Sequence, residues 1–298
     1  MPQLDDHALA ADLAERAGKL LLGLRARGGE PDALRAAGDK ESHEFLMAGL
    51  AKARPGDAVL SEEGIDDKAR LTADRVWIVD PLDGTKEFGE PGRADWAVHV
   101  ALWARTAEAP DGELIAGAVA LPAQNRVLAT EPGPVRTADP HGPGGAPADL
   151  TRTGGPVRAA GETALGDLAA TGDLRQAERG TGAKRLRMVV SRSRASDLVK
   201  DVAARIDAEL VPWGSAGAKA ATVITGENDV YLHSGGFYEW DTAAPVAVAR
   251  QRGLHVSRID GSPVVYNRDN PLLPDILVCR STIAVLLLNA IREATHAI

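Results

Sequence analysis

Two aspartates follow directly after the apolar run Val76–Val79, in the segment Asp80–Thr85 with the sequence DPLDGT. The apolar run predicts a buried strand, so both carboxylates are expected where that strand ends. The proline after Asp80 biases that residue towards extended backbone and lets the chain turn. The carboxylates of Asp80 and Asp83 and the carbonyl group of Leu82 are therefore expected to face one point.

The glycine and threonine that end this segment add groups suited to an anion. If a helix starts at Gly84 or Thr85, its first backbone N–H groups are free to bind a phosphate without a dedicated basic side chain. The simpler alternative for an isolated Asp-x-x-Asp-Gly segment is an ordinary turn in which Asp80 acts as a cap. Additional acidic residues elsewhere in the chain favour the chemical interpretation.

These additional acidic residues stand at two other predicted element ends. Glu62 and Glu63 follow the short predicted strand Ala58–Leu60. Asp241 stands at the start of a predicted apolar helix, as a ligand or as a plain N-cap, two roles that do not exclude each other. Pro245 is expected in the first turn of that helix, where its missing N–H costs little. Oxygen ligands without His or Cys favour Mg²⁺ or Mn²⁺ over zinc, and with amide donors they suit metal-assisted hydrolysis of a phosphate ester.

The elements that must position these residues begin with an α+β domain at residues 1–130. Leucines at helical spacing predict a helix over 8–24, and a second helix over 40–53 is expected with Asp39 as its cap. Five short β-rich runs follow, at 58–60, 75–80, 96–103, 115–121 and 127–130.

Residues 131–184 are rich in Gly and Pro, which predicts a long mobile insertion with at most a short helix near 162–174. The remaining residues, 185–298, alternate strand and helix patterns and predict a C-terminal α/β domain that supplies Asp241. Its expected strands are 186–191, 209–213, 229–233 and 276–279, its helices are 195–208, 216–225, 242–252 and one from 282, and a hairpin turns at Asp260-Gly261.

Composition excludes several classes of function. The chain has 298 residues, of which 44% are hydrophobic and 26% charged, and its net charge of −8 opposes binding to a nucleic acid polymer. The single cysteine, Cys279, excludes an internal disulfide and a cysteine-based zinc site. No apolar run long enough to cross a membrane and no signal segment occurs, so we expect a cytoplasmic protein that binds no membrane.

Three motifs together resemble the lithium-sensitive, Mg²⁺-dependent inositol monophosphatase superfamily. They are Glu-Glu within Ser61–Gly64, DPLDGT at Asp80–Thr85 and WDTAA at Trp240–Ala244, and the similarity extends over most of the chain outside 131–184. The continuation TKEF at Thr85–Phe88 is similar to the 3′(2′),5′-bisphosphate nucleotidase (CysQ-like) branch. Its actinobacterial type is the most similar in PGR at 91–93, DWAVH at 95–99 and GSAGAK at 214–219.

The resemblance implies a layered αβαβα sandwich of the inositol monophosphatase and fructose-1,6-bisphosphatase type, with a metal site between the two halves. Glu62, Asp80 and the Leu82 carbonyl group would hold a first Mg²⁺, and Asp80, Asp83 and Asp241 a second. A third, weaker ion is linked to the Glu62 position, and Mn²⁺ is a potential substitute for Mg²⁺.

The resemblance also implies catalytic roles for Glu62, Thr85 and Asp39, the last two orienting a water for in-line attack on phosphorus. The family's upstream Lys and Thr are missing around Asp39, and Pro245 replaces a common Gly. For the substrate contacts on the C-terminal half, a solvated surface is the alternative, and His43, His99 and His233 are interpreted as polar packing. The expected substrate-binding residues are Asp83, Gly84, Thr85, Ser191, Arg192, Ser215, Lys219 and Asp241.

The predicted function is removal of the 3′-phosphate of 3′-phosphoadenosine 5′-phosphate to give AMP and phosphate, which recycles a by-product of sulfate assimilation. Inositol 1-phosphate, fructose 1,6-bisphosphate and histidinol phosphate are alternative substrates. A non-catalytic, phosphometabolite-binding regulatory protein is a further alternative, which the complete set of expected ligands disfavours. Many family members are dimers, so a homodimer is a further expectation.

Overall fold

The computed structural model describes residues 4–132, 185–193 and 195–296. The described residues 4–132, 186–193 and 195–296 belong to one compact unit. The predicted mobile insertion and its short helix lie outside the described residues apart from 131 and 132. The division into domains at 130 and 185 stays a prediction.

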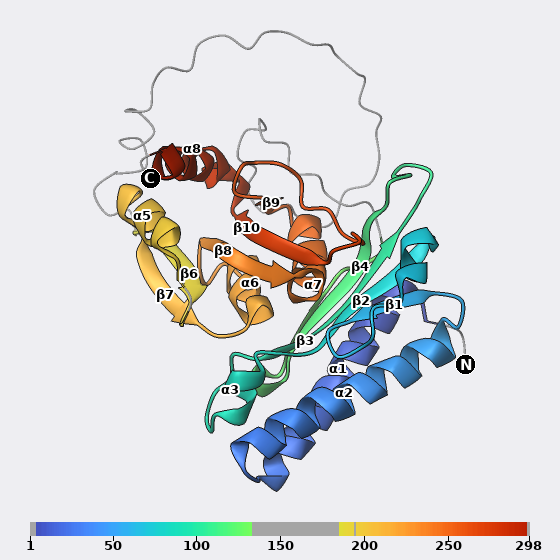
Figure 1. Cartoon of the computed structure of the whole chain (residues 1–298). Coiled ribbons are helices and arrows are strands. Elements are labelled where there is room, and N and C mark those ends of the chain that lie inside the picture. Colours follow the sequence, from blue (N-terminus) through green and yellow to red (C-terminus); the bar gives the residue numbers. More distant parts are fainter. Residues whose placement is uncertain (1–3, 133–184, 194, 297–298) are drawn as a thin grey trace, which may run out of the picture. The chain divides into compact units, whose positions relative to one another are not determined.

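The N-terminal part of this unit is a five-stranded sheet covered by two long helices (Figure 1). Asp5 caps the first helix by accepting a hydrogen bond from the N–H of Ala8, 2.8 Å away. The sheet has the order β1-β2-β3-β4-β5, with β1 parallel to β2 and the other neighbours antiparallel. The elements are α1 (Asp6–Arg27), α2 (Pro31–Ala53), β1 (Ala58–Ser61), β2 (Arg75–Asp83), α3 (Thr85–Gly89), β3 (Ala97–Ala104), β4 (Glu113–Leu121) and β5 (Arg126–Ala129), with 3₁₀ turns at Lys68–Thr72 and Pro122–Gln124.

The C-terminal part is a second five-stranded sheet with the order β7-β6-β8-β10-β9. Strand β6 is parallel to β7 and β8, whereas β10 is antiparallel to both of its neighbours. The elements are β6 (Arg187–Ser191), α5 (Asp197–Arg205), β7 (Glu209–Trp213), α6 (Ala216–Ile224), β8 (Val230–Tyr238), α7 (Glu239–Gln251), β9 (His255–Ser257), β10 (Leu272–Cys279), a 3₁₀ turn at Ser281–Ile283 and α8 (Ala284–His296).

Three apolar clusters hold these elements in five layers. Helices α1 and α2 pack on the outer face of the first sheet, and α5 and α8 pack on the outer face of the second. Helices α6 and α7 lie between the two sheets, where small residues such as Ala244 and Ala247 are buried and allow close contact with β4. The observed layers confirm the predicted αβαβα fold (Figure 1). None of the described helices is long and apolar enough to span a membrane.

The start of α2 differs from the prediction in a way that matters for the site. The helix begins at Pro31 in place of residue 40, so Asp39 lies inside it and does not cap it. Proline is well suited to the first helical position, and the alanines that follow continue the helix. The carboxylate of Asp39 is thereby free to point at another element.

Helix α7 and the segment after β9 also differ from the prediction. Helix α7 begins at Glu239, so Asp241 is its third residue and not its N-cap, and Pro245 lies inside the helix rather than in its first turn. The predicted hairpin at Asp260-Gly261 is only a turn, because β9 pairs with the later strand β10. The segment between β9 and this turn is held by Asp275 of β10, whose Oδ1 accepts a hydrogen bond from the N–H of Ile259 at 2.9 Å.

Candidate functional site

The predicted ligands meet in one cavity of about 330 Å³ between the two sheets. Strand β1 ends at Ser61 beside β2, so Glu62 reaches the same place as the carboxylates of β2. Asp241 reaches it from the first turn of α7. Eleven of the twelve predicted site residues line the cavity, namely Glu62, Asp80, Leu82, Asp83, Gly84, Thr85, Ser191, Arg192, Ser215, Lys219 and Asp241.

Asp39 joins the site indirectly, through Thr85. The Thr85 hydroxyl lies 3.1 Å from Asp39 Oδ1 and 3.1 Å from the carbonyl oxygen of Leu82. A hydroxyl has one proton, so it donates fully to only one of these acceptors at a time. Burial and the charge of Glu63 raise the pKa of Asp39 to about 6. The pair therefore offers a proton acceptor and a hydroxyl at the edge of the cavity.

Asp80 is buried without enough partners for a carboxylate. Its Oδ1 accepts a hydrogen bond from the N–H of Leu82 at 3.0 Å, whereas its Oδ2 has no hydrogen-bond partner among the described residues. Burial and the charges of Glu62, Asp83 and Asp241 raise its pKa well above the ordinary value. An unpaired buried carboxylate oxygen is costly unless a cation or a proton occupies the site.

The two other acidic residues of this group have similarly raised pKa values. Removal from water and the charge of Asp241 raise the pKa of Glu62 to about 7. Burial and the charge of Asp83 raise the pKa of Asp241 to about 6, although its Oδ2 accepts a hydrogen bond from the N–H of Tyr238 at 2.6 Å. Glu62, Asp80 and Asp241 therefore form a group of mutually repelling oxygen ligands with raised pKa values.

Asp83 has a different environment, because its carboxylate binds the start of α6. Its Oδ2 accepts hydrogen bonds from the Ser215 hydroxyl at 2.5 Å and the Gly217 N–H at 2.6 Å. Its Oδ1 accepts one from the N–H of Ala216 at 3.1 Å. Burial alone would raise the pKa of Asp83, but His99, Lys219 and Ser215 outweigh it and lower the pKa to about 2.

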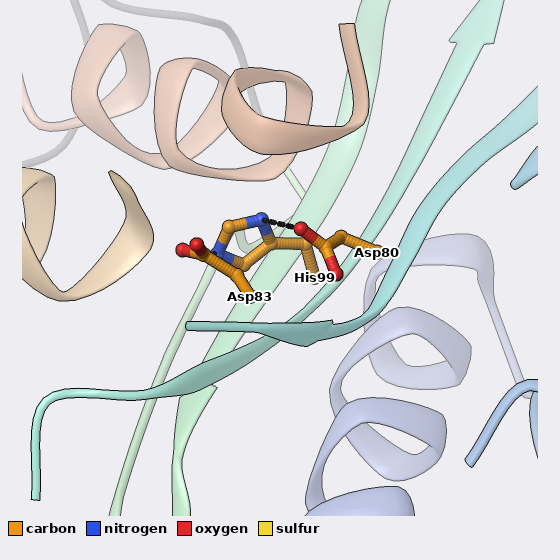
Figure 2. Close-up of side chains that lie close together, drawn as sticks. All are labelled: Asp80, Asp83 and His99. Atoms are coloured by element: carbon orange, nitrogen blue, oxygen red, sulfur yellow. Dashed lines mark ion pairs between the residues drawn. The ribbon is translucent and has the colours of Figure 1, made fainter. Parts of the chain in front are cut away.

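His99 is a site residue that the sequence analysis assigned to polar packing. Its imidazole lies between the carboxylates of Asp80 and Asp83 (Figure 2), with Nε2 3.3 Å from Asp83 Oδ2 and Nδ1 3.9 Å from Asp80 Oδ2. Nδ1 donates to the Trp240 carbonyl oxygen at 3.0 Å. A Cβ atom at Gly217 would lie only 1.9 Å from Nε2, so the imidazole needs a glycine there. Strand pairing was the missing signal, because His99 stands opposite Asp80 in the antiparallel register.

The cationic residues of the cavity are held by neighbouring groups. The Arg192 guanidinium pairs with Glu87 at 2.8 Å and with Glu90 at 3.1 Å. Lys219 is buried, donates to the carbonyl oxygens of Gly214 and Ser215 at 2.8 and 2.7 Å, and stands over the Tyr231 ring. Direct contact of Arg192, Ser191, Ser215 and Lys219 with a substrate stays a prediction.

Aromatic rings form part of the cavity wall, and the sequence analysis did not find them. His233 and Phe237 on β8 have ring centroids 4.8 Å apart, and Tyr231 lies 6.4 Å from His233. Trp213 at the end of β7 lines the same cavity. Alternate residues of a strand share a face, so Tyr231 and His233 carried a usable signal once β8 was known to border the site.

The donor set fits a divalent cation. Asp80, Asp83 and His99 place ligand atoms within 4.8 Å of one another, and Asp80 Oδ2 is a buried oxygen without a hydrogen-bond partner among the described residues. Carboxylate oxygens are the ligands that hard divalent cations prefer. The site is therefore suited to a divalent metal ion.

Known proteins resemble this chain in sequence and in fold. A 3′-phosphoadenosine 5′-phosphate phosphatase of Mycobacterium leprae is 45% identical over 297 residues, which cover 98% of this chain and 95% of that protein. The crystal structure of CysQ from Bacteroides thetaiotaomicron has a TM-score of 0.66 and 26% identity, covering 93% of this chain and 97% of that one. Inositol monophosphatase II of Staphylococcus aureus, at 19% identity, shares the fold with a TM-score of 0.70 and covers 97% and 96% of the two chains.

A model of the inositol monophosphatase family matches residues 8–296, a range that contains every element around the cavity. The family resemblance that the three acidic motifs predicted is confirmed by this match. The chain belongs to the inositol monophosphatase family.

Proposed function

We propose that this protein is a metal-dependent phosphatase that removes the 3′-phosphate of 3′-phosphoadenosine 5′-phosphate. The chemistry rests on one observation, the buried Asp80 with an oxygen that has no hydrogen-bond partner among the described residues, close to three other acidic side chains at the cavity. The choice of substrate rests on the 45% identity to the Mycobacterium leprae enzyme over nearly the whole of both chains. A nucleotide bisphosphate is the small phosphorylated partner that this assignment implies.

In this proposal the acidic residues hold two Mg²⁺ ions. Glu62, Asp80 and the Leu82 carbonyl group hold one ion, and Asp80, Asp83 and Asp241 hold the other. Asp83 can serve in both roles, because Oδ1 accepts only one hydrogen bond from α6 and keeps a lone pair. When bound, the ions polarise the phosphate, activate the nucleophile and neutralise the charge on the leaving oxygen.

The chain itself supplies proton transfer and orientation. Thr85 Oγ accepts a proton from the attacking water while its own proton passes to Asp39, 3.1 Å away. The pKa of Asp39, raised to about 6, makes this carboxylate a stronger base than an ordinary aspartate. The backbone N–H groups that follow Gly84 are proposed to bind the phosphate oxygens.

The other side of the cavity is suited to the rest of a nucleotide. Lys219 places a buried positive charge there, beside the rings of Tyr231 and His233. An anionic phosphate and a planar base need these two kinds of surface. Ser191, Arg192 and Ser215 also line the cavity and are proposed to contact the substrate.

Phosphate release from four substrates in parallel tests the proposal. Wild-type enzyme with Mg²⁺ is expected to prefer 3′-phosphoadenosine 5′-phosphate over inositol 1-phosphate, fructose 1,6-bisphosphate and histidinol phosphate by about 100-fold in kcat/KM, roughly 2.7 kcal/mol. Chelation with EDTA is the control and is expected to abolish release. Similar rates on all four would contradict the nucleotide assignment, and no release from any would contradict catalysis itself.

A further inference from the structure

Glu87 is a buried carboxylate that joins two loops at the cavity. One loop follows β6 and contains Arg192, and the other lies between β7 and α6 and contains Gly214. Glu87 lies in α3, only two positions after Thr85, and only 7% of its surface is exposed. Its Oε1 accepts a hydrogen bond from the Arg192 guanidinium at 2.8 Å. Arg192 follows the last residue of β6, so this bond links helix α3, which follows β2 of the first sheet, to the end of a strand in the second sheet.

Glu87 also packs directly against the second of these loops. A Cβ atom at Gly214 would lie 2.4 Å from the carboxylate carbon of Glu87, so only glycine allows this approach. The N–H of Gly214 donates to Asp95 Oδ2 at 2.6 Å. The two loops also contact each other directly, because the backbone N–H of Arg192 donates to the Trp213 carbonyl oxygen at 3.0 Å.

Glu87 and its partner Arg192 are distinct from the carboxylates proposed to bind metal. Glu87 forms an ion pair with the Arg192 guanidinium, whereas Asp80 faces the His99 imidazole. Glu87 touches the segments around Arg192 and Gly214 rather than the phosphate end. Glu90 binds the same guanidinium from the exposed side, at 3.1 Å. Loss of Glu87 should therefore loosen the nucleotide side of the cavity and leave the carboxylate cluster in place.

We infer that Glu87 is a positioning residue for substrate selection: acting through Arg192 and Gly214, it holds both loops where the nucleoside and its second phosphate bind. This inference rests on the proposed function. It assigns to Glu87 an effect on substrates with a nucleoside part that it would not have on a small phosphate monoester. The effect is expected mainly in KM, because the loops bind and do not react.

The test compares Glu87→Gln with wild type on two substrates. We expect kcat/KM for 3′-phosphoadenosine 5′-phosphate to fall about 10-fold more than kcat/KM for inositol 1-phosphate, with the loss carried by KM. Glu90→Gln is the matched control, because it removes the exposed partner of the same guanidinium, and it should keep the wild-type ratio of the two rates. Equal losses on both substrates would show a merely structural role and overturn the inference.

A double-mutant cycle tests whether Glu87 acts through Arg192. If it does, the Glu87→Gln, Arg192→Gln double variant loses less than the sum of the two single losses, whereas independent roles give additive losses and contradict the inference. Should Glu87→Gln fail to fold, Gly214→Ala displaces the carboxylate from the other side and must produce the same selective loss. Wild type is measured first, so a wild type inactive on the nucleotide refutes the proposed function, whereas an active one with unchanged selectivity in Glu87→Gln refutes only this inference.

Discussion

Asp80 and Asp83 stand three residues apart at the end of one strand, yet their surroundings are opposite. Both oxygens of Asp83 accept hydrogen bonds from the start of α6, and its pKa is lowered to about 2. Asp80 has one backbone donor, an oxygen with no hydrogen-bond partner among the described residues and a pKa well above the ordinary value. The protein thus satisfies one carboxylate itself and leaves the other for a ligand.

This difference separates fold stability from chemistry within a single motif. A carboxylate that is buried among like charges costs stability in the absence of a cation, and such strain is common where a ligand must bind. A carboxylate with three donors from another layer holds the two halves of the site together. Neutralising each residue in turn is therefore expected to change stability in opposite directions.

Asp80→Asn is expected to have the largest effect on activity. Asparagine keeps the acceptor for the Leu82 N–H but removes the negative charge shared by both proposed ions, so kcat/KM should fall by about 1,000-fold or more. Without metal, the same change removes the buried charge and should raise Tm by about 3–5 °C. Activity within tenfold of wild type, or a lower Tm in EDTA, would contradict the assignment.

Asp83→Asn is expected to lower stability instead, by about 2 kcal/mol, because an amide N–H₂ would face the donors of α6. Urea unfolding in EDTA measures this loss without a contribution from metal. Ser215→Ala is the matched control, since it removes one of the three α6 donors and should cost about 1 kcal/mol. An Asp83→Asn chain as stable as wild type would remove the distinction between the two aspartates.

Local sequence was enough to find most of the carboxylates of this comparison. The apolar run before Asp80, the proline after it and the motif around Asp241 predicted a strand end and a helix start, and both exist. Residue type and spacing along the chain carry that information. The family resemblance predicted the five-layered fold, and the strand and helix patterns predicted an α+β half followed by an α/β half, which agrees with it.

The parts that sequence reasoning missed depend on contacts between distant segments. His99 becomes a site residue only because β3 pairs with β2 in a register that places it opposite Asp80. The partners of Asp83 come from residues 215–217, more than 130 positions away. Asp39 was misplaced as a cap because helix starts are weakly encoded, and the helix begins at Pro31, nine residues before the predicted start. Neither strand register nor interlayer contact can be derived from one segment alone.

The smallest expected effect, the pH dependence of metal-free stability, sharpens the comparison further. The pKa of Asp241 is raised to about 6 and that of Glu62 to about 7, against about 4 in an unfolded chain. A raised folded-state pKa favours the protonated carboxyl, so its contribution to stability is complete below about pH 4 and is lost as pH rises through the folded-state pKa. In EDTA, Tm is therefore expected to fall by about 5 °C between pH 5 and pH 8.

The control for this pH effect is Asp241→Asn, which keeps the acceptor for the Tyr238 N–H and removes the charge. His99 and His255 also have shifted pKa values, so the decisive quantity is the difference between wild type and this variant across the same pH range. The variant should show a flatter dependence. Mg²⁺ should stabilise wild type more at pH 8 than at pH 5, because cations compete with protons for the same oxygens. Parallel curves for the two chains would mean that Asp241 does not share the electrostatic strain of Asp80, and the comparison would then rest on Asp80 alone.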